Sequence, residues 1–497
     1  MTDHVQTALQ ADILFPKNRA LYYGGTWHAP VKGKMGASVS PSTGESLGDF
    51  PIATQEDAEL AIAAARKGFE EWRKVAPLER AKILREAGAL IRKHGDELTL
   101  LDAADCGNPM TPMKRDAALA AQYYDFFAGL VTEMKGSTIP MAPDFLNYTL
   151  REPRGVVARI VAFNHPFMLC AGKLAAPLAA GNSVIIKPPE QAPLSGLRVA
   201  ELIGPLFPAG VISILTGGRE IGTALSSHRD IAMVTLVGSV PTGRAVMRSA
   251  SETLKQVLLE LGGKNALIAY PDADPDKVAA AAVAGMNYAW CGQSCGSVSR
   301  VFVHEDIHDA VVERIGVHIA KFKPGLPTRP ETTMGALIDK AQYDKVLAYI
   351  ESGKEEGATV AYGGKSATSE ELSKGFFVEP TVFVDVKQEM RIASEEIFGP
   401  VQSVLKWADE AAMFEQVNRV EYGLTAAIFT NDLAKAHQAA ATVQAGYVWI
   451  NGTSTHYLGA PFGGYKQSGI GREECFEELM AFTQEKNVNV NLLGARA

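Results

Sequence analysis

Two cysteines lie four residues apart in WCGQSCGSVSR, residues 290–300, within a run of small residues. A structural zinc site needs four ligands, and no second close pair of Cys or His follows Cys291 and Cys295. A thioredoxin-type redox site needs C-x-x-C, whereas the spacing here is C-x-x-x-C. One nucleophilic thiolate at Cys295 is therefore the chemical interpretation. Two small side chains packed in the interior are the structural alternative.

Three further segments place polar residues where predicted strands end. Glu260 is followed by two glycines, so it is either a base that activates a thiol or water, or a solvated carboxylate. The amide of Asn164 either donates to an oxyanion or caps the next helix. Lys187 and Glu190 suit the ribose of an adenosine, or else form a solvated ion pair.

Alternating apolar strands and helices predict the sheet that positions these groups. The near-continuous apolar runs are typical of strands buried on both faces. The strands are predicted over 155–163, 183–188, 211–217, 231–238 and 255–263. Such alternation gives a doubly wound parallel sheet, in which ligands bind outside the carboxyl ends of the strands. A second alternation begins at 265–270 and continues to about residue 465.

Composition narrows the class of protein further. The 497 residues are enough for two or three domains, and the net charge of −8 argues against nucleic acid as a partner. No apolar run approaches the roughly 20 residues that span a membrane, and the N-terminus does not resemble a signal peptide. Five cysteines at irregular spacing suit a reducing compartment, so we expect a cytoplasmic protein.

Seven motifs in order make the sequence similar to the aldehyde dehydrogenase superfamily across nearly its whole length. LELGGKNA (259–266) resembles the glutamate signature of the family, and GQSC (292–295) followed by Arg300 resembles its cysteine signature. The other matching motifs are FNHP (163–166), IIKPPEQ (185–191), LVGS (236–239), EEIFGP (395–400) and PFGGYKQSG (461–469).

The resemblance implies an α/β fold of three parts. A Rossmann-like, doubly wound NAD(P)-binding domain would comprise residues 1–127 and 151–262, and an α/β catalytic domain residues 263–482. A small β oligomerisation element would comprise a hairpin over 128–150 and a tail over 483–497. Family members are commonly homodimers or homotetramers, and we expect one of these states.

The resemblance also implies the chemical roles. Cys295 would be the nucleophile and Glu260 the general base, while Asn164 and the Cys295 backbone N–H would form the oxyanion hole. NAD is the expected cofactor, since the charge of Glu190 would oppose the 2′-phosphate of NADP, although some relatives with this Glu use both. No metal is expected. The residues implied to contact the cofactor are Phe163, Lys187, Glu190, Gly218, Gly222, Gly238, Ser239, Glu396 and Phe398.

The implied reaction is NAD(P)+-dependent oxidation of an aldehyde to a carboxylic acid through a cysteine thiohemiacetal and thioester. The residues expected around the substrate are His165, Met168, Gly172, Ser294, Gly296, His456 and Phe462. Relatives often carry aromatic side chains where this chain has His165 and His456, and a bulky one at Gly172. These departures favour a bulky aromatic aldehyde or a semialdehyde with a polar tail, unless the histidines only fill space.

Two other functions compete with this one. A CoA-acylating semialdehyde dehydrogenase would pass the acyl group to CoA, but such relatives usually lack the base at Glu260. A non-catalytic protein on the same fold would not need Cys295, Glu260 and Asn164 together.

Overall fold

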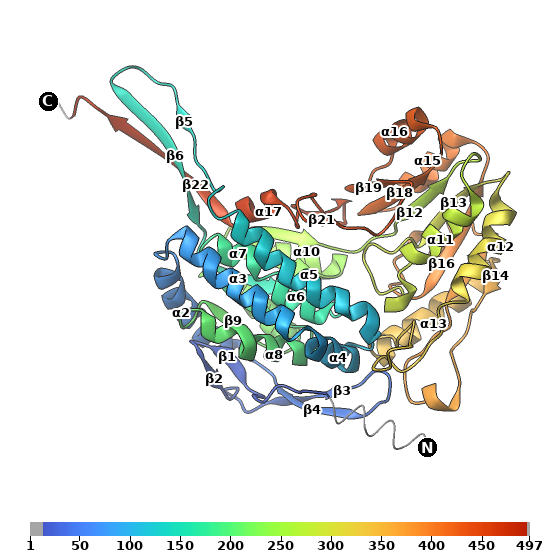
Figure 1. The fold of residues 1–497 in the computed structure, drawn as a ribbon, viewed down its shortest axis with the longest axis horizontal. Helices are drawn as coiled ribbons and strands as arrows, with labels where there is room; N and C mark the ends of the chain where they lie inside the picture. Colours follow the sequence, from blue (N-terminus) through green and yellow to red (C-terminus); the bar gives the residue numbers. More distant parts are fainter. Residues whose placement is uncertain (1–12, 495–497) are drawn as a thin grey trace.

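The computed structural model describes residues 13–494 and confirms the α/β class. Figure 1 shows two lobes, each built around one sheet, and an arm that extends away from the first lobe. The expectations for residues 1–12 and 495–497, which include the N-terminal segment and the end of the tail, lie outside the described residues.

The first lobe contains an eight-stranded sheet in the order β2-β1-β9-β8-β7-β10-β11-β21. Its parallel strands are β7 (Val156–Ile160), β8 (Ser183–Lys187), β9 (Ile212–Ile214), β10 (Ile231–Val237) and β11 (Gln256–Glu260). The chain builds outward from β7 to β9 and then returns to place β10 on the other side of β7. This reversal is the topological switch point of a doubly wound sheet, where ligands characteristically bind.

Helices cover both faces of the first sheet because alternate strand residues point to opposite sides. Val157, Val184 and Ile186 belong to one core with the helices α3 to α8. Val156, Ala158 and Ile185 belong to another core with α2, α9 and α10. The helices are α2 (Gln55–Trp72), α3 (Pro77–Lys93), α4 (Gly95–Cys106), α5 (Met110–Gly129), α6 (Pro166–Gly172), α7 (Ala175–Ala179), α8 (Leu194–Ile203), α9 (Arg219–Ser227) and α10 (Val240–Ser251).

The ends of these helices follow local sequence signals. At the start of α2 the backbone N–H of Thr54 donates to Asp57 Oδ2 at 2.8 Å, as part of a capping box. Pro77 occupies the first turn of α3, where its missing N–H costs nothing. The helical segment that follows β7 is divided into α6 and α7, and Lys173 lies at the break.

The second lobe contains a seven-stranded sheet in the order β14-β15-β16-β13-β12-β18-β19. These strands are β12 (Ala266–Ala269), β13 (Arg300–His304), β14 (Thr359–Tyr362), β15 (Thr381–Val384), β16 (Val401–Trp407), β18 (Thr425–Phe429) and β19 (Tyr447–Ile450). All neighbours are parallel except β14 and β15. The helices of this lobe are α11 (Pro275–Gly285), α12 (His308–Ile319), α13 (Lys340–Glu355), α14 (Arg391–Ser394), α15 (Glu410–Asn418) and α16 (Leu433–Thr442).

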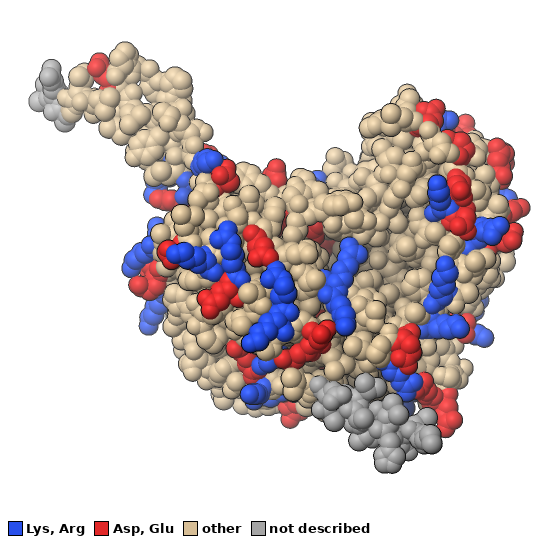
Figure 2. Space-filling view, viewed as in Figure 1, with Lys and Arg blue, Asp and Glu red and all other residues tan. Residues whose placement is uncertain are grey.

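The arm is a three-stranded antiparallel sheet in the order β22-β6-β5. It joins β5 (Thr138–Ile139) and β6 (Phe145–Pro153) to β22 (Thr483–Asn491), so segments more than 300 residues apart lie side by side. Figure 2 shows few charged side chains on the arm. Its exposed apolar residues include Ile139, Phe145, Leu146, Leu150 and Leu492.

The remaining strands are short. They are β1 (Leu21–Tyr23), β2 (Thr26–His28), β3 (Met35–Val39), β4 (Ser46–Pro51), β17 (Tyr422–Gly423), β20 (Tyr465–Lys466) and β21 (Gly469–Ile470). After the second sheet the chain returns to the first lobe, where β21 pairs with β11, and then continues through α17 (Phe476–Ala481). Within residues 13–494, no helix is both long and apolar enough to cross a membrane.

Candidate active site

The structure brings Asn164, Glu260 and Cys295 to the wall of one cavity of about 150 Å³. Asn164 follows β7, Glu260 is the last residue of β11, and Cys295 lies in the loop between α11 and β13. The first two therefore lie at the carboxyl ends of parallel strands, close to the switch point between β7 and β10. Three polar groups that are distant in the sequence thus face a common space.

The loop that carries Cys295 is shaped by unusual backbone angles. Helix α11 ends at Gly285, and Cys291 and Gly292 then adopt φ values of +53° and +64°. A Cβ at Gly292 would lie 2.2 Å from Gly399 O, so only glycine allows this close approach. The side-chain oxygen of Gln293 accepts a hydrogen bond from Ile338 N at 3.0 Å. The small residues of the motif therefore build a fixed turn.

Asn265 connects this turn to the strand that begins the second sheet. Its Nδ2 donates to the carbonyl oxygens of Cys295 at 2.7 Å and Ser297 at 2.9 Å. Its Oδ1 accepts from Thr425 N at 3.0 Å. The glutamate signature therefore contains a residue that holds the cysteine loop, which physically links the two motifs.

Glu260 is a buried carboxylate with few hydrogen-bond partners. Its Oε1 has no hydrogen-bond partner among the described residues. Burial raises the pKa of Glu260 to about 8, opposed by a hydrogen bond with Cys295. A carboxyl group with this pKa can take up and release a proton near neutral pH, which is what a general base requires.

The thiol of Cys295 is partly exposed and lines the cavity. Burial and the neighbouring Glu260 carboxylate raise the pKa of Cys295 well above its ordinary value. Ionisation requires Glu260 to accept the proton or a positive charge to approach.

Two donors are free for an oxyanion beside this thiol. The side chain of Asn164 lines the cavity, and its Nδ2 donates no hydrogen bond to any described residue. The backbone N–H of Cys295 likewise makes no hydrogen bond within residues 13–494. These groups meet the geometric need for a pair of uncommitted donors at the reacting centre.

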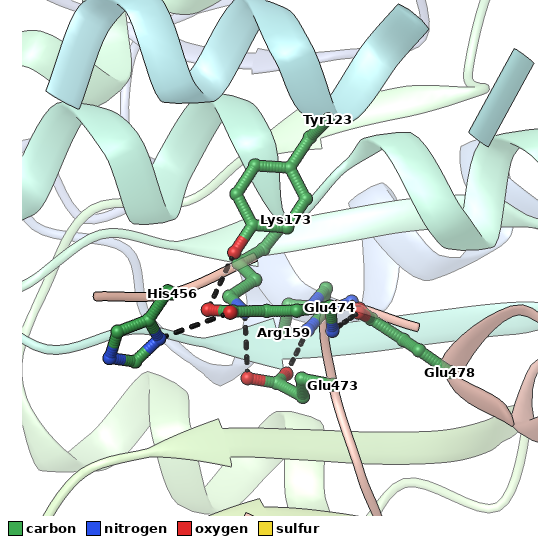
Figure 3. Close-up of polar contacts among 7 residues, drawn as sticks. All are labelled: Tyr123, Arg159, Lys173, His456, Glu473, Glu474 and Glu478. Carbon is green, nitrogen blue, oxygen red and sulfur yellow. Dashed lines mark hydrogen bonds and ion pairs between the residues drawn. The ribbon is translucent and has the colours of Figure 1, made fainter. Parts of the chain in front are cut away.

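A buried ionic network lies beneath the cavity and was not anticipated from the sequence (Figure 3). Lys173 Nζ donates to Glu473 Oε2 at 2.7 Å, and Arg159 Nη2 donates to Glu473 Oε1 at 2.7 Å. Arg159 also lies 3.4 Å from Glu478 Oε1. Lys173 and Glu473 line the cavity, and the break between α6 and α7 positions Lys173. The sequence signal was GREE (471–474), which is separated from the PFGGYKQSG motif only by Ile470.

Four of the residues expected at the cofactor lie together at the edge of the first lobe. Lys187 ends β8, and burial lowers its pKa to about 8 against the effect of Glu190. A Cβ at Gly218 would come 2.5 Å from Glu190 Oε2, and a Cβ at Gly222 would come 3.9 Å from Lys187 Cδ. Gly218 therefore leaves room for the Glu190 carboxylate at the start of α9.

The other expected cofactor residues come from both lobes and do not belong to the lining of the cavity that contains Cys295. Glu396 Oε1 accepts from Gly263 N at 2.9 Å, and the ring of Phe398 meets Phe163 edge-on at 5.7 Å. Gly238 N donates to Glu260 O at 3.0 Å, and the hydroxyl of Ser239 caps α10. The described residues hold no group of three or more His, Cys, Asp or Glu side chains that could bind a metal ion.

Most of the residues expected around the substrate do line the cavity. They are His165, Met168, Ser294, Gly296, His456 and Phe462. Gly172 is a correction, because it lies outside this lining and faces α5, where an added Cβ would come 3.0 Å from Tyr123. Gly172 therefore allows close helix packing and does not widen the tunnel.

The sequence analysis missed several cavity residues. Asp116 and Arg115 come from α5, Glu474 follows Glu473, and Trp290 and Trp449 provide aromatic walls. Asp116 lies 49 positions from its partner His165, so only the folded chain reveals the pair.

Cys291 is buried in the interior and is held by the backbone. Its Sγ donates to Gly335 O at 2.9 Å, and burial raises its pKa. Cys291 does not line the cavity that contains Cys295.

Comparison with known proteins agrees with this geometry. The model of the family described as "Aldehyde dehydrogenase family" matches residues 27–488. The aldehyde dehydrogenase tropH of Talaromyces stipitatus is 50% identical over 487 residues, which cover 97% of this chain and 95% of the relative.

Solved structures of the same fold superpose over nearly the whole chain. An NAD+ complex of an aldehyde dehydrogenase from Bacillus cereus has a TM-score of 0.93 and 40% identity, with 98% of each chain covered. The P. syringae indole-3-acetaldehyde dehydrogenase AldA, in complex with NAD+ and IAA, has a TM-score of 0.94 and 34% identity, covering 98% of this chain and 99% of that one. The chain therefore belongs to the aldehyde dehydrogenase family and is an enzyme of that class.

Proposed function

We propose that this chain oxidises an aldehyde to a carboxylic acid with NAD+ and that Cys295 is the nucleophile. The observation that carries the proposal is the convergence of Asn164, Glu260 and Cys295 on one cavity. A thiol, a base and an uncommitted amide are the groups that acyl chemistry on sulfur requires.

The first step is attack of Cys295 on the aldehyde carbon. Glu260 accepts the thiol proton, since the raised pKa of this carboxyl makes it a competent base near neutral pH. The C–S bond forms as the carbonyl electrons move to oxygen. The amide of Asn164 and the backbone N–H of Cys295 donate to that oxyanion, and one such donor is typically worth about 3 kcal/mol in a transition state.

The cofactor proposal depends on the open surfaces beside Lys187, Glu190 and Glu396. NAD+, when bound, accepts a hydride from the carbon attached to Cys295. Lys187 and Glu190 would hold the adenosine ribose, and the carboxylate of Glu190 disfavours a 2′-phosphate. Glu396 would hold the nicotinamide ribose. A Cβ at Gly262 would lie only 2.2 Å from Glu396 Oε2, so the glycine is what allows the carboxylate to occupy this position.

The second chemical step releases the acid. The acyl group is now a thioester on Cys295. Glu260 releases the thiol proton to solvent and then, as the carboxylate, removes a proton from the attacking water. The C–O bond forms, the C–S bond breaks, and the thiolate leaves.

For the substrate we propose a bulky aromatic or heteroaromatic aldehyde, or a semialdehyde with a polar tail. Trp290, Trp449 and Phe462 line the cavity and supply aromatic surface. The name of the P. syringae relative, an indole-3-acetaldehyde dehydrogenase, supports a heteroaromatic substrate within this family.

A panel of aldehydes tests the reaction, with NADH absorbance at 340 nm as the signal. We expect activity without CoA, benzaldehyde to be oxidised with a higher kcat/KM than acetaldehyde, and the Cys295→Ala variant to produce no NADH. A requirement for CoA would instead identify an acylating enzyme. No NADH from any aldehyde would favour a non-catalytic protein, and a clear preference for acetaldehyde would contradict the bulky substrate.

For the organisation of the chain we propose the units suggested by the sequence: a cofactor unit (1–127 and 151–262), a catalytic unit (263–482) and an arm (128–150 and 483–497). The exposed apolar residues of the arm support a homodimer or homotetramer assembled through it. The five cysteines are all free, which supports a reducing, cytoplasmic location. Light scattering of a Leu146→Glu variant tests the assembly, and we expect smaller particles than for the wild type.

A further inference from the structure

Two imidazole rings on the cavity wall are each held by a buried carboxylate. The Nδ1 of His165 lies 2.7 Å from Asp116 Oδ2, and the Nδ1 of His456 lies 3.1 Å from Glu474 Oε2. All four residues line the same cavity. Asp116 belongs to α5, and Glu474 also accepts a hydrogen bond from the hydroxyl of Tyr123 at 2.9 Å. The two pairs come from separate parts of the chain, and in each the Nδ1 of a histidine contacts a carboxylate oxygen.

The carboxylates decide which ring nitrogen faces the substrate. An ionised carboxylate only accepts hydrogen bonds, so Nδ1 of each ring must carry the proton. The other nitrogen, Nε2, makes no hydrogen bond to any described residue in either ring. Figure 3 shows that nitrogen of His456 on the side of the ring away from Glu474. Each ring therefore offers one unused polar atom beside the cavity.

The chemistry of Nε2 selects the substituent that it can bind. In neutral imidazole Nε2 accepts a hydrogen bond, and in imidazolium it donates one. A carboxylate substituent suits only the charged ring, and an ammonium substituent suits only the neutral ring. A hydroxyl group both donates and accepts, so it satisfies Nε2 in either state.

The remaining walls suit one flat ring. Trp290 lies 5.5 Å from His165, and Phe462 lies 4.5 Å from His456, measured between ring centroids. A cavity of about 150 Å³ has the volume that accommodates benzene in an apolar protein interior. Aromatic walls beside polar side chains, which include Arg115 and Lys173 as well as the two histidines, suit a ring that carries a polar substituent.

We propose that His165 and His456 are specificity-determining residues that recognise a ring hydroxyl group, and that the substrates are hydroxylated aromatic aldehydes. Asp116 and Glu474 act as positioning residues that fix the tautomer and direction of each ring. The inference rests on the proposed oxidation of aromatic aldehydes and narrows its substrate class. Recognition involves hydrogen bonds alone and adds no covalent step.

The first test uses the wild-type enzyme with NAD+. We compare kcat/KM for benzaldehyde, 3-hydroxybenzaldehyde, 4-hydroxybenzaldehyde and 4-methoxybenzaldehyde. A hydroxyl matched by an imidazole should raise kcat/KM at least about tenfold over benzaldehyde for one of the two hydroxyl positions. The methoxy compound keeps the oxygen but loses the donor, so it should not share the gain obtained with 4-hydroxybenzaldehyde if that position is the favoured one. Equal values for all four compounds would overturn the inference.

Substitutions then assign the effect to the rings. His165→Phe and His456→Phe keep an aromatic side chain but remove Nε2, and at least one should bring the ratio of hydroxylated to plain benzaldehyde close to 1. Exposed His437, which lies outside the cavity, provides the matched control, and His437→Phe should leave the ratio unchanged. An unchanged ratio in both cavity variants would contradict the assignment.

A binding measurement keeps the inference testable if a variant loses turnover. The Cys295→Ser variant with NAD+ should bind 4-hydroxybenzoate more tightly than benzoate, or 3-hydroxybenzoate if the meta position is favoured. Adding Asp116→Asn or Glu474→Gln should reduce that preference only partly, since an amide oxygen still accepts from Nδ1.

The failures of the two proposals differ. If acetaldehyde is oxidised but no aromatic aldehyde is, the broader substrate proposal fails and this inference fails with it. If benzaldehyde is a good substrate but hydroxyl groups and the two histidines make no difference, only this inference fails. A strong preference for 4-carboxybenzaldehyde would also overturn it, because that substituent requires charged rings.

Discussion

Glu260 and Glu474 are both buried carboxylates on the wall of one cavity, yet their pKa values move in opposite directions. Burial raises the pKa of Glu260 to about 8, and one of its oxygens has no partner among the described residues. Burial acts on Glu474 in the same sense, but hydrogen bonds from His456 and Tyr123 and the charge of Lys173 lower its pKa below the ordinary value. The number of donors, not the depth of burial, separates the two.

This difference shows how hydrogen bonding gives neighbouring carboxyl groups different functions. A carboxylate without partners holds its proton near neutral pH and can exchange it, so it serves as a base. A carboxylate that accepts several hydrogen bonds stays ionised and fixes the groups that donate to it. Glu260 is placed to react, and Glu474 is placed to orient His456.

Removing the base should have the largest effect. Glu260→Gln keeps the shape of the side chain but cannot accept a proton, so we expect steady-state NADH production to fall by about 10²–10⁴-fold. Stopped-flow measurement at 340 nm checks the result. Full activity in this variant would show that the comparison assigns the wrong carboxylate.

Disrupting the Lys173–Glu473 ion pair beneath the cavity should lower the stability of the protein and raise the pKa of Glu260. Lys173→Met leaves Glu473 without one of its cations, and loss of one partner from a buried pair typically costs about 3–5 kcal/mol. Calorimetry should show a lower Tm. Exposed Lys82, which pairs with Glu79 at 2.7 Å, is the matched control, and Lys82→Met should cost less than about 1 kcal/mol.

The activity of the wild type should depend on pH through Glu260. The working form of this group is ionised, and its pKa in the folded protein is about 8. We therefore expect kcat to rise about tenfold per pH unit below that value and to level off above it, when thioester hydrolysis limits turnover. Lys173 lowers the pKa of Glu260, so Lys173→Met should move the inflection upward. A profile that is flat between pH 6 and 9 would contradict this role.

The reacting end of the site could be predicted from the sequence, and the substrate end only in part. Cys295, Glu260 and Asn164 lie at strand ends or in a glycine-rich turn, and local spacing reveals such positions. The partners of His165 and His456 are set by packing between distant segments, as Asp116 of α5 illustrates. Gly172 was misassigned because a glycine on a helix is equally consistent with an open tunnel and with close contact to Tyr123. The division into two sheets followed directly from the strand and helix alternation.

The charge of Glu474 should have the smallest effect and gives the sharpest separation of the two carboxylates. Glu474→Gln retains an oxygen that can accept from His456 and Tyr123 but removes the negative charge, so we expect only a severalfold loss in kcat/KM for hydroxylated benzaldehydes. Glu474 is not among the groups that shift the pKa of Glu260, so the inflection near pH 8 should stay in place. The pH dependence of kcat for this variant checks the point. An inflection displaced by more than about one pH unit would mean that the two carboxylates titrate as one unit.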